Sequence, residues 1–277
     1  MNELKKSVLD LRVSAIERLH ERYVLLRLTQ DEQLPQMAPG QFVEIRIDGA
    51  GAPLLRRPIS VNFVDEESNE LWLLVAIVGK GTQWMASLQK GDLVNVVGPL
   101  GNGFSQPSRE NLLQSSAGVF SPSKDGGSRV LLVGGGVGVA PLLYQGCSLR
   151  RAGCEPAFLL GARTAKDLLL LDEFRKYGEV YVTTEDGSAG ERGFVTQHSI
   201  LQKERFPLIQ TCGPTPMMKA VARFAYQQGI ECEASLENMM ACGLGACLCC
   251  VEKTTEGNLC VCKEGPVFNI KKLLWQL

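Results

Sequence analysis

The sequence predicts a multidomain chain of β and α/β architecture, with an N-terminal antiparallel β-barrel, a parallel α/β domain and a small cysteine-rich C-terminal domain. Three observations predict this arrangement. Short apolar segments separated by turn residues fill residues 8–98, and strands alternate with helices from residue 129. Seven of the ten cysteines lie between Cys232 and Cys262. At roughly 100–200 residues per domain, 277 residues suffice for two domains and a small third.

The first domain is expected over residues 1–104. Polar and apolar residues alternate in segments such as Val43–Ile47, and dipeptides such as Pro39-Gly40 and Gly91-Asp92 mark turns. The expected strands are Val8–Ile16, Tyr23–Thr29, Phe42–Ile47, Ile59–Val64, Leu71–Val78 and Leu93–Val97, with a short helix at Gln83–Gln89. Six short strands at this spacing favour a small antiparallel barrel.

Residues 105–128 are rich in Ser, Gly and Pro and lack hydrophobic periodicity, so they are expected to form a linker or surface loop. Strands are then expected at Val130–Val133, Ala157–Leu160, Val180–Thr183 and Leu208–Gln210, and helices at Ala140–Arg151, Leu171–Lys176, Val195–Gln202 and Thr215–Gln228. This alternation predicts a Rossmann-like parallel sheet over residues 129–230. Residues 231–277 are too few to form a stable apolar core of their own without a disulfide or a metal site.

Composition excludes several classes of protein. The chain has 29 Lys plus Arg against 30 Asp plus Glu, and this near-neutral charge argues against nucleic-acid binding. No apolar run reaches the ~18 residues that cross a bilayer, and the first ten residues lack the apolar core of a signal peptide. A cytoplasmic protein without membrane or nucleic-acid partners is therefore expected. The only histidines, His20 and His198, lie in no motif, which argues against histidine-based catalysis.

The cysteines carry the most specific signal. Cys242-x4-Cys247-x2-Cys250 has the plant-type spacing of a [2Fe–2S] cluster, and Cys262 follows as a fourth thiolate. The intervening glycines allow the backbone to curl around a cluster. Zinc is the main alternative, but zinc sites usually show two C-x2-C pairs and only one is present here. Cys249 and Cys260 also lie nearby, so counting alone leaves their contribution open.

A glycine run directly after an apolar strand is the second signal. Glycines let a diphosphate approach the backbone, and a proline suits the first turn of a helix whose N-terminus attracts anions. The candidate residues are Gly134, Gly135, Gly136, Gly138 and Pro141. The run departs from G-x-G-x-x-G at Val139. No acid follows the second strand, where Arg163 stands, so the motif leaves NAD and NADP open.

Three weaker motifs gain meaning from their order. The segment Arg57–Ser60 offers an arginine for a flavin diphosphate and a hydroxyl for the flavin ring. Gly81-Thr82 begins the short predicted helix, and Cys212-Gly213-Pro214 ends the last predicted parallel strand, where open α/β sheets bind ligands. Each of them alone is also typical of an ordinary turn or surface strand.

Taken in order, these motifs resemble the ferredoxin–NADP reductase superfamily. The sequences that carry the resemblance are RPIS, KGT, GPLGNGF, GGGVGVAP and CGPTPM. The tail SLENMMACGLGACLCCVEK with VCKEGPVF more closely resembles the electron transfer subunits of B-type dihydroorotate dehydrogenases, which use NAD+. The resemblance covers nearly the whole chain except residues 105–128.

The resemblance implies a role for each matching position. It places FAD on Arg57, Pro58, Ile59, Ser60, Leu74, Val75, Ala76, Gly81 and Thr82. It places NAD on Gly134, Gly135, Gly136, Gly138, Pro141, Cys212, Gly213 and Pro214. It makes Cys242, Cys247, Cys250 and Cys262 the ligands of the [2Fe–2S] cluster. Ile59 stands where many members have a tyrosine that stacks on the flavin, and Cys249 stands where glycine is commoner.

The resemblance also implies an electron relay with no acid–base catalytic residue on this chain. An FMN-bearing catalytic subunit would oxidise dihydroorotate to orotate in pyrimidine synthesis, and electrons would pass through the cluster and FAD to NAD+. The implied assembly is a cytoplasmic heterotetramer of two of each chain. Two alternatives remain: a subunit of an NAD(P)H:ferredoxin or sulfide oxidoreductase, and a zinc-stapled redox-sensing binding protein.

Overall fold

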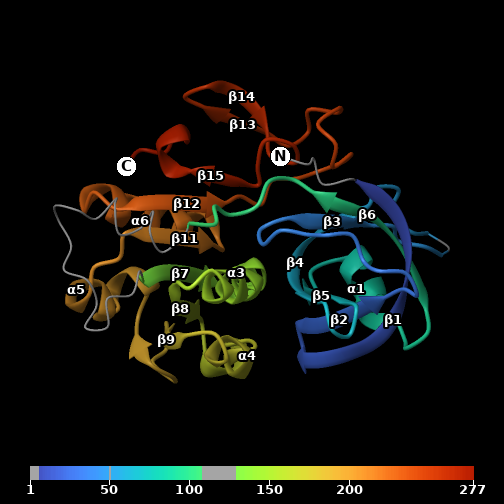
Figure 1. Cartoon of the computed structure of the whole chain (residues 1–277), viewed down its shortest axis with the longest axis horizontal. Helices are drawn as coiled ribbons and strands as arrows, with labels where there is room; N and C mark the ends of the chain where they lie inside the picture. Colours follow the sequence, from blue (N-terminus) through green and yellow to red (C-terminus); the bar gives the residue numbers. More distant parts are fainter. Residues whose placement is uncertain (1–5, 50, 108–128) are drawn as a thin grey trace. The chain divides into compact units, whose positions relative to one another are not determined.

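The computed structural model describes residues 6–49, 51–107 and 129–277, and the chain divides into two compact units (Figure 1). One unit comprises Met1–Gly103 with Glu237–Pro266, and the other comprises Phe104–Leu236 with Val267–Leu277. Among the described residues, no helix has both the length and the apolar character that a membrane crossing requires.

The first unit contains a closed antiparallel barrel, as the strand pattern predicts. Its strands are β1 (Ser7–His20), β2 (Tyr23–Thr29), β3 (Phe42–Ile45), β4 (Arg57–Asp65), β5 (Glu70–Ala76) and β6 (Leu93–Leu100), joined in the order β1-β2-β5-β4-β3-β6. Alternation explains the fold locally: Leu11 and Val13 are fully buried while Asp10 and Arg12 are exposed. Strand β1 is longer than predicted because it pairs with both β2 and β6 and changes register along its length.

Helix α1 (Lys80–Ser87) begins three residues before the predicted helix. The hydroxyl of Thr82 explains the earlier start, because its Oγ1 accepts hydrogen bonds from the main-chain N of Val78 at 2.9 Å and of Gly79 at 3.1 Å. These bonds give partners to donors that a helix start leaves unpaired. The turn before α1 is therefore fixed in place.

The cysteine-rich segment 237–266 belongs to the same compact unit as the barrel. Its hairpin consists of β13 (Val251–Thr254) and β14 (Gly257–Cys260). The end of β6 holds this segment through Asn102, whose N donates to the O of Gly265 at 2.6 Å and whose Nδ2 donates to the O of Lys263 at 3.1 Å. Residues 237–266 form the segment that we call the cysteine loop. One main-chain and one side-chain hydrogen bond from Asn102 thus bind it to the barrel.

The second unit is built on a seven-stranded sheet of order β10-β9-β8-β7-β11-β12-β15. Its strands are β7 (Arg129–Gly135), β8 (Glu155–Ala162), β9 (Glu179–Thr184), β10 (Glu191–Arg192), β11 (Leu208–Cys212), β12 (Glu231–Ser235) and β15 (Val267–Asn269). Its α-helices are α3 (Ala140–Arg151), α4 (Leu171–Arg175), α5 (Ile200–Lys203) and α6 (Thr215–Gln227). The six strands from β10 to β12 pair in parallel, and β15 pairs antiparallel with β12. The predicted parallel sheet is confirmed.

The continuous helix predicted at Val195–Gln202 is wrong. A 3₁₀ turn at Val195–Gln197 ends at His198, which is extended, and α5 begins only at Ile200. The break is stabilised locally, because the Nδ1 of His198 accepts a bond from the N of Ile200 at 3.0 Å. His198 is therefore a buried structural residue that supports a helix start.

The start of the predicted linker is fastened to the second unit. Gln145 and Gln210 are fully buried, and the Nε2 of each donates to the O of Ser105 at 3.1 Å. Gln106 donates to the Oε1 of Gln145 at 2.5 Å. The remainder of the predicted linker, residues 108–128, lies outside the described residues.

Candidate cofactor sites

Two motifs that are far apart in the sequence meet at the carboxyl end of the parallel sheet. Strand β7 pairs with β11 so that Gly134 lies opposite Cys212. A Cβ atom at Gly138 would lie 2.4 Å from the Cα of Gly213 and 2.5 Å from its N. Only glycine allows this approach, because backbone atoms cannot move aside as a flexible side chain can. The glycine run and the Cys212–Pro214 turn therefore form one surface.

The order of the strands predicts a ligand site at this surface. From β7 the chain runs outward to β8 and β9 and then returns to β11 on the other side of β7. The strand order thus reverses between β7 and β11, and open α/β sheets bind ligands beside that reversal. Pro141 lies in the first turn of α3, so the start of this helix faces the same end of the sheet. All eight predicted NAD residues lie in the glycine run or the Cys212–Pro214 turn, including the ends of β7 and β11 and the start of α3 that border them.

An acidic turn that sequence inspection missed lies beside Arg163. The N of Glu185 donates to the O of Ala162 at 3.1 Å, and the N of Asp186 donates to the O of Arg163 at 3.3 Å. The Oδ1 of Asp186 accepts bonds from Ser188, which hold the pKa of that carboxyl below its usual range. Glu185 and Asp186 directly follow β9, so this strand brings negative charge to the end of β8.

The predicted flavin residues gather around the beginning of β4. The side chain of Arg57 lies over Gly81, where a Cβ atom would come within 3.0 Å of the arginine Cγ and Nε. The side chain of Arg57 thus covers the start of α1, where Gly81 and Thr82 are buried, and places a positive charge beside the start of this helix, an arrangement suited to a diphosphate. Arg57, Pro58, Ile59 and Ser60 are all partly exposed. This accessible strip fits a bound FAD.

The three predicted flavin residues of β5 divide by burial. Leu74 and Val75 are almost completely buried in the barrel core, whereas Ala76 is partly exposed. Because both side chains are already buried, Leu74 and Val75 can offer a flavin mainly their main-chain atoms. We therefore expect the side-chain contacts with FAD to come mainly from β4 and α1.

Three of the four predicted cluster ligands have an amide donor near their sulfur atom. The N of Leu244 lies 3.4 Å from the Sγ of Cys242, and the N of Gly245 lies 3.1 Å from the Sγ of Cys262. The N of Cys262 in turn lies 3.4 Å from the Sγ of Cys250. Amide hydrogen bonds to sulfur stabilise thiolates and tune cluster potentials.

The thiols of this loop differ in acidity. Burial raises the pKa of Cys242, but bonds from the amides of Leu244, Cys247 and Ala246 outweigh it and lower the pKa to about 6. Burial and a hydrogen bond with Cys250 raise the pKa of Cys262 to about 12. Among the described residues, no group of three Cys, His, Asp or Glu side chains is arranged around a single ion. A [2Fe–2S] cluster needs four thiolates over two irons, and the four predicted cysteines of this segment supply that number.

The backbone of the cysteine loop adopts left-handed conformations at three positions. Gly243 and Gly245 have positive φ angles of 65° and 83°, and Leu248 has a φ of 59°, which is unusual for a residue with a side chain. Such strain concentrates at functional sites. Cys249 is exposed, and the thiol of Cys260 donates to the O of Gly245 at 3.9 Å.

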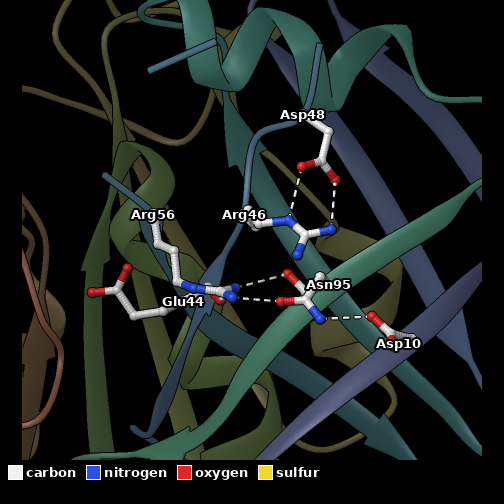
Figure 2. Close-up of polar contacts among 6 residues, drawn as sticks. All are labelled: Asp10, Glu44, Arg46, Asp48, Arg56 and Asn95. Atoms are coloured by element: carbon white, nitrogen blue, oxygen red, sulfur yellow. Dashed lines mark hydrogen bonds and ion pairs between the residues drawn. The ribbon is translucent and has the colours of Figure 1, made fainter. Parts of the chain in front are cut away.

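A buried carboxylate of the barrel lies directly beneath the cysteine loop. Glu44 in β3 is 1% exposed, and neither of its carboxylate oxygens has a hydrogen-bond partner among the described residues (Figure 2). A Cβ at Gly243 would lie 2.9 Å from its Cγ. Burial raises the pKa of Glu44 to about 7, although the nearby Arg56 lowers it. Its sequence context gave no signal, because alternation places Glu44 on the outer face of its strand.

Replacing Glu44 with glutamine is expected to stabilise the protein more at pH 8 than at pH 5. The pKa is raised from 4.5 to about 7 by folding, so the native state holds a proton that the unfolded chain releases. Stability is therefore lost as the pH rises from 4.5 to 7, by at most about 3 kcal/mol at 1.36 kcal/mol per pKa unit. Thermal melting of the Glu44→Gln variant and wild type across this range measures the difference. Glu67→Gln, on the surface, is the control and should show no such trend.

Family models match each part of the chain. Residues 10–104 match an oxidoreductase FAD-binding domain, and residues 132–223 match an oxidoreductase NAD-binding domain. Residues 237–274 match the iron–sulfur cluster binding domain of dihydroorotate dehydrogenase B. The predictions of FAD, NAD and an iron–sulfur cluster are therefore confirmed, and the zinc alternative has no support from these matches.

Curated relatives decide the family. The chain is 40% identical over 236 residues to the dihydroorotate dehydrogenase B (NAD(+)) electron transfer subunit of Fusobacterium nucleatum, covering 83% of this chain and 84% of the relative. It is 38% identical to that of Lysinibacillus sphaericus, covering 88% and 90%. The chain belongs to this family. It is an electron transfer subunit of an oxidoreductase, and that family name implies a separate catalytic partner.

Solved structures place the family in a wider group. The fold matches the structure of an NADH-dependent reduced ferredoxin–NADP oxidoreductase studied for flavin-based electron bifurcation, with a TM-score of 0.78 and 30% identity over 96% of this chain and 90% of that one. It also matches an Amycolatopsis cytochrome P450 reductase with a TM-score of 0.64 and 26% identity, over 82% and 67%. These matches confirm the predicted ferredoxin reductase architecture.

Proposed function

We propose that this electron transfer subunit connects NAD+ to an FMN-bearing catalytic subunit that oxidises dihydroorotate to orotate in pyrimidine synthesis. One observation carries the proposal: the four-cysteine loop, which matches the dihydroorotate dehydrogenase B model, lies in the same compact unit as the flavin barrel. A flavin exchanges electrons in pairs with nicotinamide and singly with an iron–sulfur cluster, so it links the two kinds of carrier. Electrons would pass from FMN through the cluster and FAD to NAD+.

This chain's residues supply binding and orientation rather than acid–base chemistry. Arg57 with the start of α1 would hold the diphosphate of FAD, and the glycine run with the Cys212–Pro214 turn, which meet at Gly138 and Gly213, would hold that of NAD. Cys242, Cys247, Cys250 and Cys262 would hold the cluster. The proposed domains follow these roles: residues 1–104 for FAD, 129–230 for NAD and 231–277 for the cluster.

Exposed apolar side chains around the cysteine loop support a partner at this surface. Met239 is 83% exposed, Leu248 is 65% exposed and Leu244 is 47% exposed. Three large apolar residues exposed so close together in sequence are typical of an interaction surface. The partner is proposed to dock here, in a cytoplasmic heterotetramer of two chains of each kind.

Replacing Met239 with glutamate is expected to weaken the complex by about tenfold or more, because an interface core excludes an unpaired charge. NADH reduction of the flavin should remain unchanged, since Met239 lies in neither nucleotide site. Titration of the partner against the variant measures the dissociation constant. Leu274→Glu is the matched control: Leu274 is 60% exposed but lies outside the cysteine loop, and its substitution should not change the dissociation constant. Equal effects of the two substitutions would contradict this docking surface.

The assay that tests the function is dihydroorotate-dependent NAD+ reduction by the protein purified without oxygen together with its natural partner. Activity establishes the substrate and the endpoints of the relay. An intact complex that keeps flavin and iron–sulfur absorbance but shows no activity would overturn the substrate assignment. The similarity to the ferredoxin–NADP oxidoreductase structure favours the second candidate in that case, and NADH-dependent reduction of ferredoxin tests it.

A further inference from the structure

Two consecutive arginines lie where β4 begins, Arg56 directly before the strand and Arg57 as its first residue, and their guanidinium groups have different surroundings. Arg57 lies over Gly81 in the proposed FAD site. Arg56 turns instead to the wall of the barrel, where its Nη1 lies 3.3 Å from the O of Glu44 and 3.1 Å from the O of Asn95 (Figure 2). Its Nη2 donates to the Oδ1 of the same asparagine. Arg56 therefore joins the residue before β4 to both β3 and β6.

The acceptor of this contact is itself held in place. Asn95 is 7% exposed, and its Nδ2 donates to the Oδ1 of Asp10 at 2.6 Å. Asp10 lies in β1, so a third strand is linked through Asn95 to the guanidinium that contacts β3 and β6 (Figure 2). A chain of hydrogen bonds in a partly buried place rigidifies the groups that it links.

This network touches the base of the cysteine loop as well. The carbonyl of Glu44 accepts from Arg56, and the side chain of Glu44 lies against Gly243. The positive charge of Arg56 also stabilises the charged form of the Glu44 carboxylate, which has no hydrogen bond among the described residues. One arginine thus borders the flavin strand on one side and the support of the cysteine loop on the other.

We propose that Arg56 is a positioning residue of the flavin site: it fixes the start of β4 to the barrel wall, so that Arg57 is held where it binds the diphosphate of FAD. A planar guanidinium is required, because it supplies donors to three acceptors in fixed directions, which a lysine ammonium does not. The inference rests on the proposed assignment of Arg57 to FAD and goes beyond it by giving its neighbour a separate role.

A double-mutant cycle on the full chain tests the proposal. FAD is removed and titrated back, and its dissociation constant is measured for wild type, Arg56→Met, Arg57→Met and the double variant. Losing a hydrogen bond to a charged group should raise this constant by about 10- to 100-fold for Arg57→Met, and about tenfold for Arg56→Met. If Arg56 acts through Arg57, the double variant binds FAD no more weakly than Arg57→Met alone.

Additive effects of the two substitutions, or an Arg56→Met variant with wild-type FAD affinity, would overturn the proposal. An Arg57→Met variant with wild-type affinity would instead show that the assigned FAD site is wrong, so the two failures are distinct. Arg56→Lys should not restore affinity, and full rescue by it would also contradict the proposed role.

Two further variants separate positioning from loss of fold. Asn95→Ala removes the side-chain acceptor of Arg56 and should raise the FAD dissociation constant above the wild-type value, which keeps the proposal testable if Arg56→Met fails to fold. A folded Asn95→Ala variant with wild-type FAD affinity would overturn the proposal. Arg46→Met is the matched control, because the guanidinium of Arg46 pairs with Asp48 at the surface and both side chains are about half exposed (Figure 2). It should leave FAD affinity unchanged, and a loss equal to that of Arg56→Met would overturn the proposal.

Discussion

The Cys250→Ser variant is expected to lose the iron–sulfur cluster and all electron transfer to the partner, while NADH still reduces its flavin. Cys250 is 2% exposed, and its Sγ accepts a bond from the N of Cys262. A serine hydroxyl is a harder and less acidic ligand, and iron–sulfur clusters select thiolates. Iron content and visible absorbance report the cluster, and rapid mixing with NADH reports the flavin.

The neighbouring cysteine supplies a matched control for this variant. Cys249 is exposed and adjacent in sequence, so Cys249→Ser makes the same chemical change beside the predicted ligand. It should keep the cluster and the flux to the partner. A folded Cys250→Ser variant with bound FAD that lost NADH reduction as well would contradict the proposed electron order. Loss of the cluster in Cys249→Ser would show that the ligand set includes this residue.

Local patterns predicted most of the fold, because strand alternation and glycine-rich turns depend on neighbouring residues. Strand β12 was missed, since Glu231–Ser235 contains two glutamates and no β-branched residue. It forms a strand because β11 offers it a full parallel register, with Leu208 opposite Glu231. That partner is distant in sequence, and no local signal reveals it.

The candidate sites show the same limit. Each glycine motif could be recognised in the sequence, because a run of glycines indicates a tight turn or a close approach to the backbone. The contact between Gly138 and Gly213, however, depends on the order of strands in the sheet. Alternation along β3 would place the side chain of Glu44 on the outer face of the strand, but the cysteine loop buries it there. Arg56 gave no signal distinct from Arg57, and only the hydrogen bonds to the barrel wall separate their roles.

Replacing Gly138 with alanine is expected to reduce kcat/KM for NADH about 100-fold, the usual effect of a 1 Å displacement in a reactive site. The new Cβ would lie 2.4 Å from the Cα of Gly213 and 2.7 Å from the carbonyl carbon of Cys212, so the two nucleotide loops must separate. FAD and cluster content should remain unchanged, because both groups are assigned to the other compact unit. Flavin reduction measured against NADH concentration gives the effect.

The control for this variant lies at the opposite end of helix α3. Gly153 has a φ of 78°, and a Cβ there would meet nothing within 4 Å, so Gly153→Ala costs about 1–2 kcal/mol of backbone strain without touching the loops. It should lower the melting temperature while leaving the NADH dependence unchanged. Gly138→Ala should instead change the NADH dependence strongly, and because its Cβ would lie 2.4 Å from the Cα of Gly213 it should also lose stability. Gly153→Ala thus shows the effect of lost stability alone. Unchanged kinetics in Gly138→Ala would mean that the nucleotide does not bind at these two loops.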